Sequence, residues 1–269
     1  MIPTVDPPQE NTMTSTSTTT RAGIELSGVT MDFDNPAGGT KRVLHGIDLT
    51  VPSGEFIALV GKSGCGKTTL LNMMAALLQP TAGTVTVAGQ PPRAAREHLG
   101  FMLARDALLP WRSAVRNVEY GLELRGIGRA ERRKRARRWL EAVHLGDAER
   151  LWTWQLSQGM RQRVALARTW ALDPEVLLMD EPFAALDVNT RLAVQHEFLE
   201  LWQSERRKTV VFVTHDLGEA IALADRIVLL GEGRILDDVE VGIDRPRDLT
   251  EIGSHPRYQE LHQRLRAAI

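Results

Sequence analysis

One nine-residue segment limits what this chain can fold into more than any other part of it. The segment GKSGCGKTT runs from Gly61 to Thr69 and matches the phosphate-loop pattern G-x-x-x-x-G-K-[ST]. A short apolar run, EFIALVG, leads into it, and an amphipathic helical pattern follows. Glycines let such a loop curl until successive N–H groups and a helix N-terminus face one anion. The sequence therefore predicts a strand–loop–helix unit that binds the β- and γ-phosphates of a nucleotide.

Within this loop each residue type has an expected role. Lys67 is expected to reach phosphate oxygens, and Thr68 to offer its hydroxyl to Mg²⁺. Cys65 is expected to be structural, because a small side chain fits at that position. The predicted nucleotide-binding residues of the loop are Gly61, Lys62, Ser63, Gly64, Cys65, Gly66, Lys67, Thr68 and Thr69.

A second segment, VLLMDEP, supplies carboxylates. Asp180 ends a buried apolar run, where it can hold a water bound to Mg²⁺. Glu181 follows it and can polarise an attacking water as a general base. Taken alone, these acids could equally be caps at a strand end. Together with a phosphate loop, they favour nucleotide hydrolysis.

The remaining pattern predicts an α/β fold. The buried strands VLLMD, TVVFVTH and RIVLLGEG alternate with helices, which indicates a sheet with parallel strands. IELSGVTMDF and RVLHGIDLTV alternate apolar and polar residues, as half-buried strands do. Two helices are expected to present apolar faces, formed by Leu70, Leu71, Met74, Leu77 and Leu78, and by Val188, Leu192, Leu199 and Trp202. Residues from about 93 to 172 are predicted to form an inserted helical subdomain. Its basic segment RAERRKRARRWLEAVHL is interpreted as a solvated helix with Trp139, Leu140 and Val143 packing inward.

Composition excludes several other kinds of protein. Lys and Arg total 33 and Asp and Glu total 34, so nothing suggests electrostatic binding of nucleic acid. A single cysteine excludes an internal disulfide and fits a reducing compartment. No apolar run reaches the roughly 18 residues that span a bilayer, and the start of the chain lacks a secretory-signal pattern. Residues 1–22 are rich in Thr, Ser and Pro and are expected to be a disordered tail, followed by one domain over 23–240 and a C-terminal extension over 241–269.

From about Ile24 to Gly233 the chain resembles the ATP-binding cassette (ABC) family, the nucleotide-binding subunits of ABC transporters. GKSGCGKTT resembles its Walker A loop, LSQGMRQRVALAR its signature sequence, LLMDEP its Walker B motif, AALD its D-loop and THD its switch-histidine motif. The combination of Walker A and signature is specific to this family. The resemblance implies a P-loop NTPase cassette of α/β class, with a RecA-like mixed sheet core, an N-terminal antiparallel β part and the inserted helical subdomain.

The resemblance also implies a mechanism. Two identical cassettes would meet head to tail with two ATP molecules between them, each held by the phosphate loop of one and the signature of the other. Glu181 and His215 would be catalytic, with His215 contacting the γ-phosphate, and Phe33 would stack on the adenine. Thr68 and Asp180 would form the Mg²⁺ site. Ser157, Gln158 and Gly159 would contact the partner's nucleotide, and Ser157 stands just before a helix whose N-terminus favours an anion.

Two positions depart from the family pattern. Gln158 stands where the signature has Gly, and it is tolerated if it lies in the first helical turn, where φ is negative. Ala104 stands where the family has a Gln that ligates Mg²⁺ and links the nucleotide to the next loop. A methyl group can do neither. Water is expected to complete the metal shell, with slower turnover and weaker coupling but ATP binding mostly retained.

The segment ALLPWRSAVRNV resembles the corresponding loop of importer cassettes in the nitrate, sulfonate and taurine group, as do MDEPFAALDVNTR and DRPRDL. The implied partners are permease subunits and an extracytoplasmic solute-binding protein, with the cassette peripheral at the cytoplasmic face of the membrane. Leu108, Leu109, Pro110 and Trp111 are interpreted as an exposed docking surface. The alternative, that these residues fill a gap under a loop, stays open above all for Leu108. The transported solute cannot be read from such a subunit.

Two other functions are weighed against transport. A soluble cassette for DNA repair or ribosome work would need a long coiled-coil insertion or a second cassette, and this sequence has neither. A cassette with weakened hydrolysis could act as a regulatory or partner-dependent subunit. Glu181 and His215 argue against that alternative, whereas Ala104 and Gln158 argue weakly for it.

Overall fold

The computed structural model describes residues 22–34, 38–103, 105–204 and 208–269, which form two sheets. The first is antiparallel, in the order β2-β1-β4, and consists of β1 (Ala22–Asp34), β2 (Thr40–Pro52) and β4 (Ala82–Val87). The second has the order β5-β6-β7-β3-β8-β9. Its strands are β3 (Phe56–Val60), β5 (Leu99–Met102), β6 (Val176–Asp180), β7 (Thr209–Thr214), β8 (Arg226–Gly231) and β9 (Arg234–Glu240). Only β9 runs antiparallel to its neighbour, so the predicted mixed sheet is confirmed.

Seven α-helices occur in the described residues: α1 (Lys67–Met74), α2 (Ala114–Leu124), α3 (Arg129–Ala142), α4 (Gln158–Trp170), α5 (Val188–Ser204), α6 (Leu217–Leu223) and α7 (Pro256–Ala268). Short 3₁₀ turns lie at Ala95–His98, Gly146–Ala148, Thr153–Gln155 and Ile252–Ser254. No helix in these ranges is long and apolar enough to cross a membrane.

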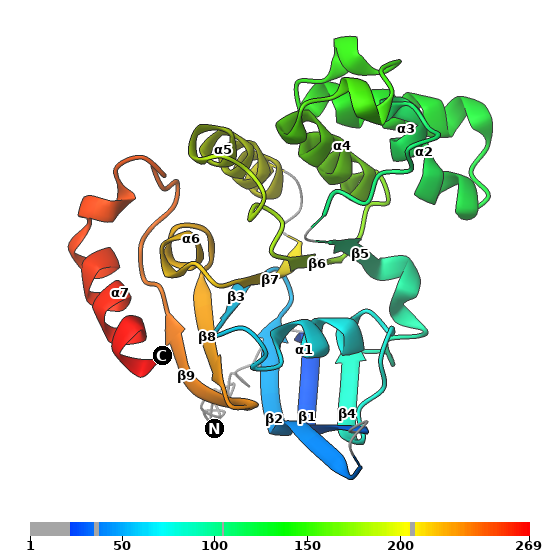
Figure 1. Cartoon of the computed structure of the whole chain (residues 1–269). Helices are drawn as coiled ribbons and strands as arrows, with labels where there is room; N and C mark the ends of the chain where they lie inside the picture. Colours follow the sequence, from blue (N-terminus) through cyan, green and yellow to red (C-terminus); the bar gives the residue numbers. More distant parts are fainter. Residues whose placement is uncertain (1–21, 35–37, 104, 205–207) are drawn as a thin grey trace, which may run out of the picture.

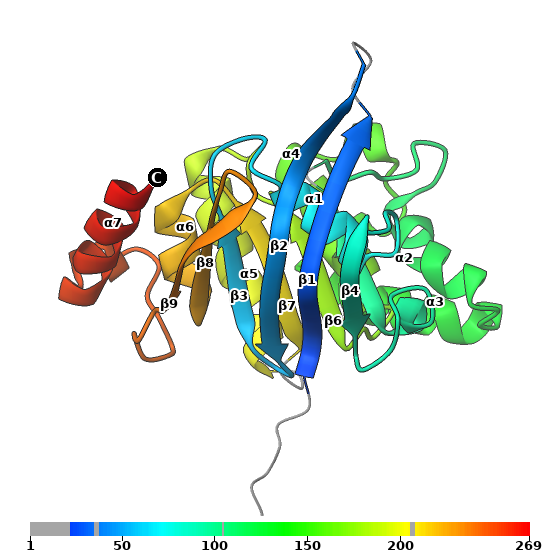
Figure 2. The same cartoon turned by 90° about the horizontal axis from the view of Figure 1, so that it is seen from below.

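The six-stranded sheet has a core on each face because successive strand side chains point in opposite directions. In β3, Phe56, Ala58 and Val60 join the core beneath α4, α5 and α6, whereas Ile57 and Leu59 join the core beneath α1 and the antiparallel sheet. Figure 1 shows α1 and α4 on opposite sides of this sheet, and Figure 2 shows β1 and β2 lying across it. All of β3 is buried, as its continuous apolar run predicts.

Helices α2, α3 and α4 gather at one end of the molecule (Figure 1). Trp139 of α3 is 7% exposed and Leu140 and Val143 are fully buried, which confirms the predicted inward face of the basic helix. Of its cations, Lys134, Arg135, Arg137 and Arg138 are exposed, whereas Arg133 pairs with Glu119 of α2 at 2.5 Å. The helices are inserted between β5 and β6, which pair directly, so the strand order of the sheet is uninterrupted. Strand β5 lies inside the range from about 93 to 172 predicted for the helical subdomain, but it belongs to the six-stranded sheet.

Two predicted helix faces are partly wrong. Helix α1 ends at Met74, because Ala76 takes a left-handed φ of 59° and the N–H groups of Leu77 and Leu78 both turn back to the carbonyl of Asn72. Leu77 is therefore 66% exposed instead of buried. Val188 is the first residue of α5 and is 69% exposed, whereas Leu199 and Trp202 further along are buried as expected.

The proposed disordered tail lies, except for Ala22, outside the described residues, and so does Ala104. The C-terminal extension carries helix α7, which packs on α6 through buried Leu261 and Leu265.

Candidate functional site

The phosphate loop joins β3 to α1 and depends on its glycines. Gly64 and Gly66 have φ of 80° and 109°, a region that side-chain-bearing residues rarely adopt. A Cβ on Gly66 would lie 2.5 Å from Cδ2 of Leu44, and one on Gly61 would overlap the carbonyl oxygen of Leu230. The loop is therefore wedged between β2 and β8, with no room for larger residues at either position.

Lys67 lies at the centre of this loop. Its side chain is buried, and its Nζ donates to the carbonyl oxygens of Gly61 at 2.6 Å and Lys62 at 3.0 Å. The ammonium group is thus held against the loop, where it can turn to phosphate oxygens. Cys65 is buried with its Sγ 3.9 Å from this Nζ, in keeping with a structural role.

Thr68 and Asp180 meet although 112 positions separate them. The hydroxyl Oγ1 of Thr68 lies 3.3 Å from Oδ1 of Asp180. Burial raises the pKa of Asp180 and the neighbouring Glu181 adds to the rise, while the bond from Thr68 and the charge of Lys67 oppose it. A hydroxyl and a carboxylate beside a phosphate site are the oxygen ligands that Mg²⁺ prefers. These two residues therefore fit the predicted metal.

Glu181 follows Asp180 in an unusual backbone conformation. Its φ is 45°, a region that costs a non-glycine residue energy and that tends to persist at functional sites. Its N–H donates to the carbonyl of Val213 at 2.9 Å, and its Oε2 lies 3.2 Å from Nδ1 of His215. Both side chains remain accessible, 32% for Glu181 and 63% for His215. The predicted base and the predicted switch histidine are thus in contact.

The strand order explains why these residues meet. Strands β3, β7 and β6 are parallel neighbours, so their carboxyl ends share one edge of the sheet. The phosphate loop follows β3, His215 follows β7, and Asp180 ends β6. Residues from three distant segments therefore converge at one edge.

The signature residues lie elsewhere. Ser157 is the N-cap of α4, and its Oγ accepts the N–H of Met160 at 3.2 Å. Gln158 is the first helical residue and has no positive φ, which confirms that Gln is tolerated there. Gly159 is buried, and a Cβ there would lie 2.5 Å from Cγ2 of Thr190 in α5. Because α4 and α1 cover opposite faces of the sheet, this helix end does not complete the phosphate site of its own chain (Figure 1).

Phe33, the predicted adenine contact, lies in β1 opposite Lys41 of β2. It is 39% exposed, so part of its ring is open to a stacking partner.

The loop after β5 is held firmly by a residue that sequence analysis did not single out. Asn117 of α2 is fully buried, and its Oδ1 accepts the N–H of Leu109 at 2.7 Å. Its Nδ2 lies 3.1–3.2 Å from the carbonyl oxygens of Leu109, Arg112 and Ser113. The four predicted docking residues differ in exposure. Leu108 packs against the core and Leu109 is partly buried. Pro110 is exposed, and Trp111 is 67% exposed.

Two arginines of α4 fasten the same loop to the signature helix. Arg161 pairs with the Asp106 carboxylate at 3.0 Å and donates to the carbonyl of Leu156 at 2.8 Å. Arg168 donates to the carbonyls of Asp106 and Ala107 at 2.8 and 2.7 Å, and burial lowers its pKa. Gln162 donates to the carbonyl of Pro182, which follows Glu181. Apart from the bond of Arg161 to Leu156, five positions away, these links join residues 20 to 62 positions apart, so only the three-dimensional arrangement shows them.

A second aromatic group also escaped sequence analysis. Trp152 and Trp154 stack with ring centroids 5.1 Å apart and are 40% and 68% exposed. A β-bridge joins Trp152 to Ser113, two residues after Trp111. The two tryptophans of the WTW segment lie close to the signature in the sequence, and this repetition could have indicated an exposed aromatic pair.

The C-terminal end of the chain also approaches the phosphate loop. Ala268 and Ile269 line a cavity of about 530 Å³ together with Lys62, Ser63, Gly64 and Cys65. Sequence analysis assigned this extension no chemistry and gave no sign of the approach.

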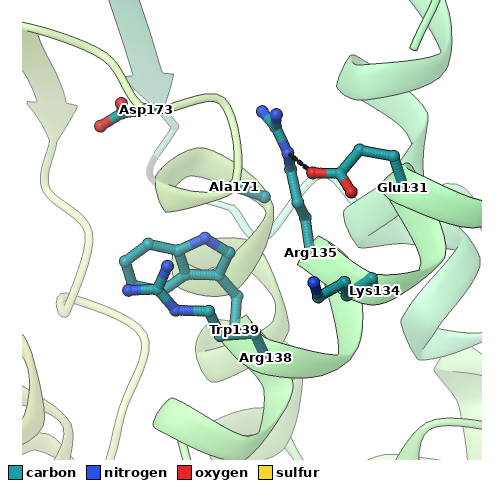
Figure 3. Close-up of a pocket in the computed structure, with 7 residues that line it drawn as sticks. All are labelled: Glu131, Lys134, Arg135, Arg138, Trp139, Ala171 and Asp173. Carbon is teal, nitrogen blue, oxygen red and sulfur yellow. Dashed lines mark hydrogen bonds and ion pairs between the residues drawn. The ribbon is translucent and has the colours of Figure 1, made fainter. Parts of the chain in front are cut away.

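A cavity of about 410 Å³ beside α3 contains none of the predicted site residues (Figure 3). Its charges are largely matched: Arg135 pairs with Glu131 at 2.7 Å, and Lys208 pairs with Asp173 at 2.7 Å. The guanidinium of Arg138 lies 5.3 Å from the centroid of the Trp139 ring. This pairing agrees with a solvated basic helix.

The similarities of this chain to known proteins agree with the nucleotide site described above. The profile of the ABC transporter family matches residues 44–184. The aliphatic sulfonates import ATP-binding protein SsuB 1 of Mesorhizobium japonicum is 46% identical over 209 residues, covering 78% of this chain and 77% of that protein. The taurine import ATP-binding protein TauB of Pseudomonas savastanoi pv. phaseolicola is 41% identical over 238 residues, covering 86% and 91%.

A solved ATP-binding cassette, a dimer in a post-hydrolysis state bound to ADP and Pi, superimposes with a TM-score of 0.72 at 30% identity. The match covers 82% of this chain and 100% of the solved one. Nothing in these comparisons favours the alternative of a regulatory cassette. The chain belongs to the ABC transporter family as one of its ATP-binding subunits, and these subunits are ATPases.

Proposed function

We propose that this chain hydrolyses ATP to energise import of a small anionic solute of the sulfonate, taurine or nitrate kind. One observation carries the proposal: Lys67, Thr68, Asp180, Glu181 and His215 meet at one edge of the central sheet. The sulfonate and taurine import subunits among its relatives support the transport role and the solute class.

The residues divide the chemistry of hydrolysis between them. The N–H groups of the loop and Lys67 bind the phosphates, and Glu181 takes a proton from the attacking water. His215 orients that water and contacts the γ-phosphate. Thr68 and Asp180 hold Mg²⁺, which when bound neutralises phosphate charge.

A second copy completes each site. Ser157 and the N-terminus of α4 form an anion-binding end that faces no phosphate of its own chain. In a head-to-tail dimer this end contacts the γ-phosphate held by the partner subunit. The dimeric cassette bound to ADP and Pi supports this arrangement.

Three exposed tryptophans and an exposed proline form the proposed permease surface, which we define as Pro110, Trp111, Trp152 and Trp154. Tryptophans exposed side by side are typical of protein interfaces. Arg161 and Arg168 fasten Asp106 and Ala107 to α4. These two residues precede Pro110 and Trp111 in the same loop, so a permease that moves the loop also moves α4 and with it Ser157. The chain thus acts as a peripheral subunit at the cytoplasmic face of the membrane, in a system with an extracytoplasmic solute-binding protein.

Uptake by cells tests this proposal. A strain without the gene is supplied with wild type, Lys67→Ala or Arg96→Ala, and uptake of radiolabelled taurine, ethanesulfonate and nitrate is measured. Arg96 is an exposed cation away from the site and serves as the matched control. Wild type and Arg96→Ala should restore uptake of at least one solute, and Lys67→Ala should not. Deletion without effect on any of the three contradicts the solute class, and restoration by Lys67→Ala contradicts the ATP-driven role.

A further inference from the structure

Glu219 of α6 has no part in the chemistry proposed above, yet both oxygens of its half-buried carboxylate accept hydrogen bonds. Its Oε2 lies 2.5 Å from Oγ1 of Thr214, and its Oε1 lies 2.7 Å from Nε2 of Gln195. The Thr214 oxygen also accepts the N–H of Asp216 at 3.1 Å, so its own proton points to Glu219. Glu219 therefore accepts two hydrogen bonds, one on each oxygen.

The first of these bonds secures the turn that carries His215. Thr214 ends β7 and is 2% exposed, and Asp216 is the N-cap of α6. Asp216 Oδ1 accepts the N–H of Glu219 at 3.1 Å. The residues before and after His215 are thus both bonded into one ring that closes through Glu219, which fixes the backbone from which the imidazole reaches Glu181.

The second bond leads to the D-loop. Gln195 lies on α5, is 5% exposed and sits two turns after Asp187. Asp187 itself accepts the N–H groups of Thr190 and Arg191, at 3.1 and 2.8 Å. Arg191 returns to the carbonyl of Leu186 at 2.8 Å. The D-loop is therefore bonded to the start of α5, and α5 is bonded to Glu219.

We propose that Glu219 is a positioning residue that joins the D-loop helix to the switch-histidine turn, so that His215 is placed for hydrolysis only when α5 is in its native position. The inference rests on the roles proposed for Glu181 and His215. The same carboxylate serves both arms, so displacing α5 pulls on Thr214 and thereby on the backbone at His215. A shift of the D-loop on dimer closure is thereby transmitted to the hydrolytic residues of the same chain.

An isosteric substitution separates this role from bulk and folding. In Glu219→Gln the negative charge is lost, and one of the two acceptor oxygens becomes an NH₂ donor that faces either the Thr214 hydroxyl or the Gln195 amide. The hydroxyl, or the amide once turned over, can accept from this donor, so both bonds of the link become neutral ones, which are weaker than bonds to a charged carboxylate. Gln195→Leu breaks the D-loop arm alone and keeps the carboxylate.

Steady-state ATP hydrolysis by the purified full-length chain provides the test. Glu219→Gln should lower kcat about tenfold, the size expected when bonds to a charged group become bonds to a neutral one, and leave KM for ATP within about twofold. Gln195→Leu should lower kcat less, and the double variant should be no slower than Glu219→Gln, since both act on one link. Glu219→Asp should recover part of the rate.

Glu55→Gln is the matched control, because Glu55 is also a partly buried carboxylate, paired with Arg226 at 3.2 Å away from the site. It should leave kcat unchanged. A kcat for Glu219→Gln within twofold of wild type, an equal loss in Glu55→Gln, or strictly additive effects of Gln195→Leu and Glu219→Gln would overturn the inference. If Glu219→Gln fails to fold, Gln195→Leu decides alone: no change in its kcat rejects the link. Glu181→Gln is measured in parallel, because its retention of activity would reject the proposed site and not Glu219 alone.

Discussion

The phosphate-loop edge of the sheet and the N-terminal end of α4 are both built to bind phosphate, yet only the first is assembled within this chain. At the sheet edge, Thr68 meets Asp180 at 3.3 Å and Glu181 meets His215 at 3.2 Å. At the helix end, Ser157 is exposed and bonds only within its own first turn. In the proposed dimer the first region carries the reaction and the second contacts the nucleotide of another copy, so each chain would supply two halves of different sites.

The largest expected effect comes from breaking the first region alone. Glu181→Gln keeps the shape of the side chain and removes the base, so kcat for ATP should fall about 10²- to 10⁴-fold with ATP binding retained. Phosphate release and binding of a fluorescent ATP analogue measure the two properties. Asp238→Asn, which alters an exposed carboxylate paired with Arg226, is the control and should keep its rate. Residual activity above a tenth of wild type in Glu181→Gln contradicts its assignment as the base.

Mixing two inactive variants tests whether the two regions belong to different chains. Lys67→Ala disables the phosphate loop, and Ser157→Arg blocks the signature end with a bulky cation. A mixed dimer retains one intact site, made of the loop of one copy and the signature of the other. Mixing equal amounts should restore about a quarter of the wild-type rate, because half the dimers are mixed and each has one working site. Two variants that stay inactive together would contradict the composite site.

The same contrast explains what could be predicted from sequence. The phosphate loop, Asp180 and Glu181 are contiguous motifs whose chemistry follows from residue type and spacing. Their meeting at one edge follows from the strand order of the structure. Arg161 binds Asp106, 55 positions away, and Glu219 binds Gln195, 24 positions away, so only the fold brings these partners near. Asn117 bonds to residues within eight positions of it, but no local pattern marks that contact. The end of α1 was missed for a local reason, because a helical apolar pattern continued past Ala76, whose left-handed backbone ends the helix.

A smaller effect should separate permease docking from ATP binding. Trp111→Ala removes a side chain that is 67% exposed and should weaken permease binding about 10- to 30-fold, as expected for an interface tryptophan. Trp154→Ala should act in the same direction if the stacked pair belongs to the same surface. Pull-down with the permease in detergent measures binding, and nucleotide affinity should stay unchanged. The control is Leu124→Ala, an exposed apolar residue at the far end of α2 that is 71% exposed. Equal losses of docking and folding in Trp111→Ala would favour a packing role.

The smallest expected effect lies at the connection between the two regions. Ala104 occupies the position where the family has a glutamine that links metal to docking loop, and no residue between Leu99 and Arg116 replaces it. Because Asp106 is fastened to Arg161 and Arg168, the docking loop here is tied chiefly to the signature half. Ala104→Gln restores the side chain that the family has at this position, so ATP turnover in the assembled complex should rise about two- to threefold, which is less than 1 kcal/mol. Ala104→Leu, with similar bulk and no amide, should give no gain. If Ala104→Gln leaves both the rate and its response to permease unchanged, the missing glutamine does not limit this cassette, and the arginine ties alone carry the coupling.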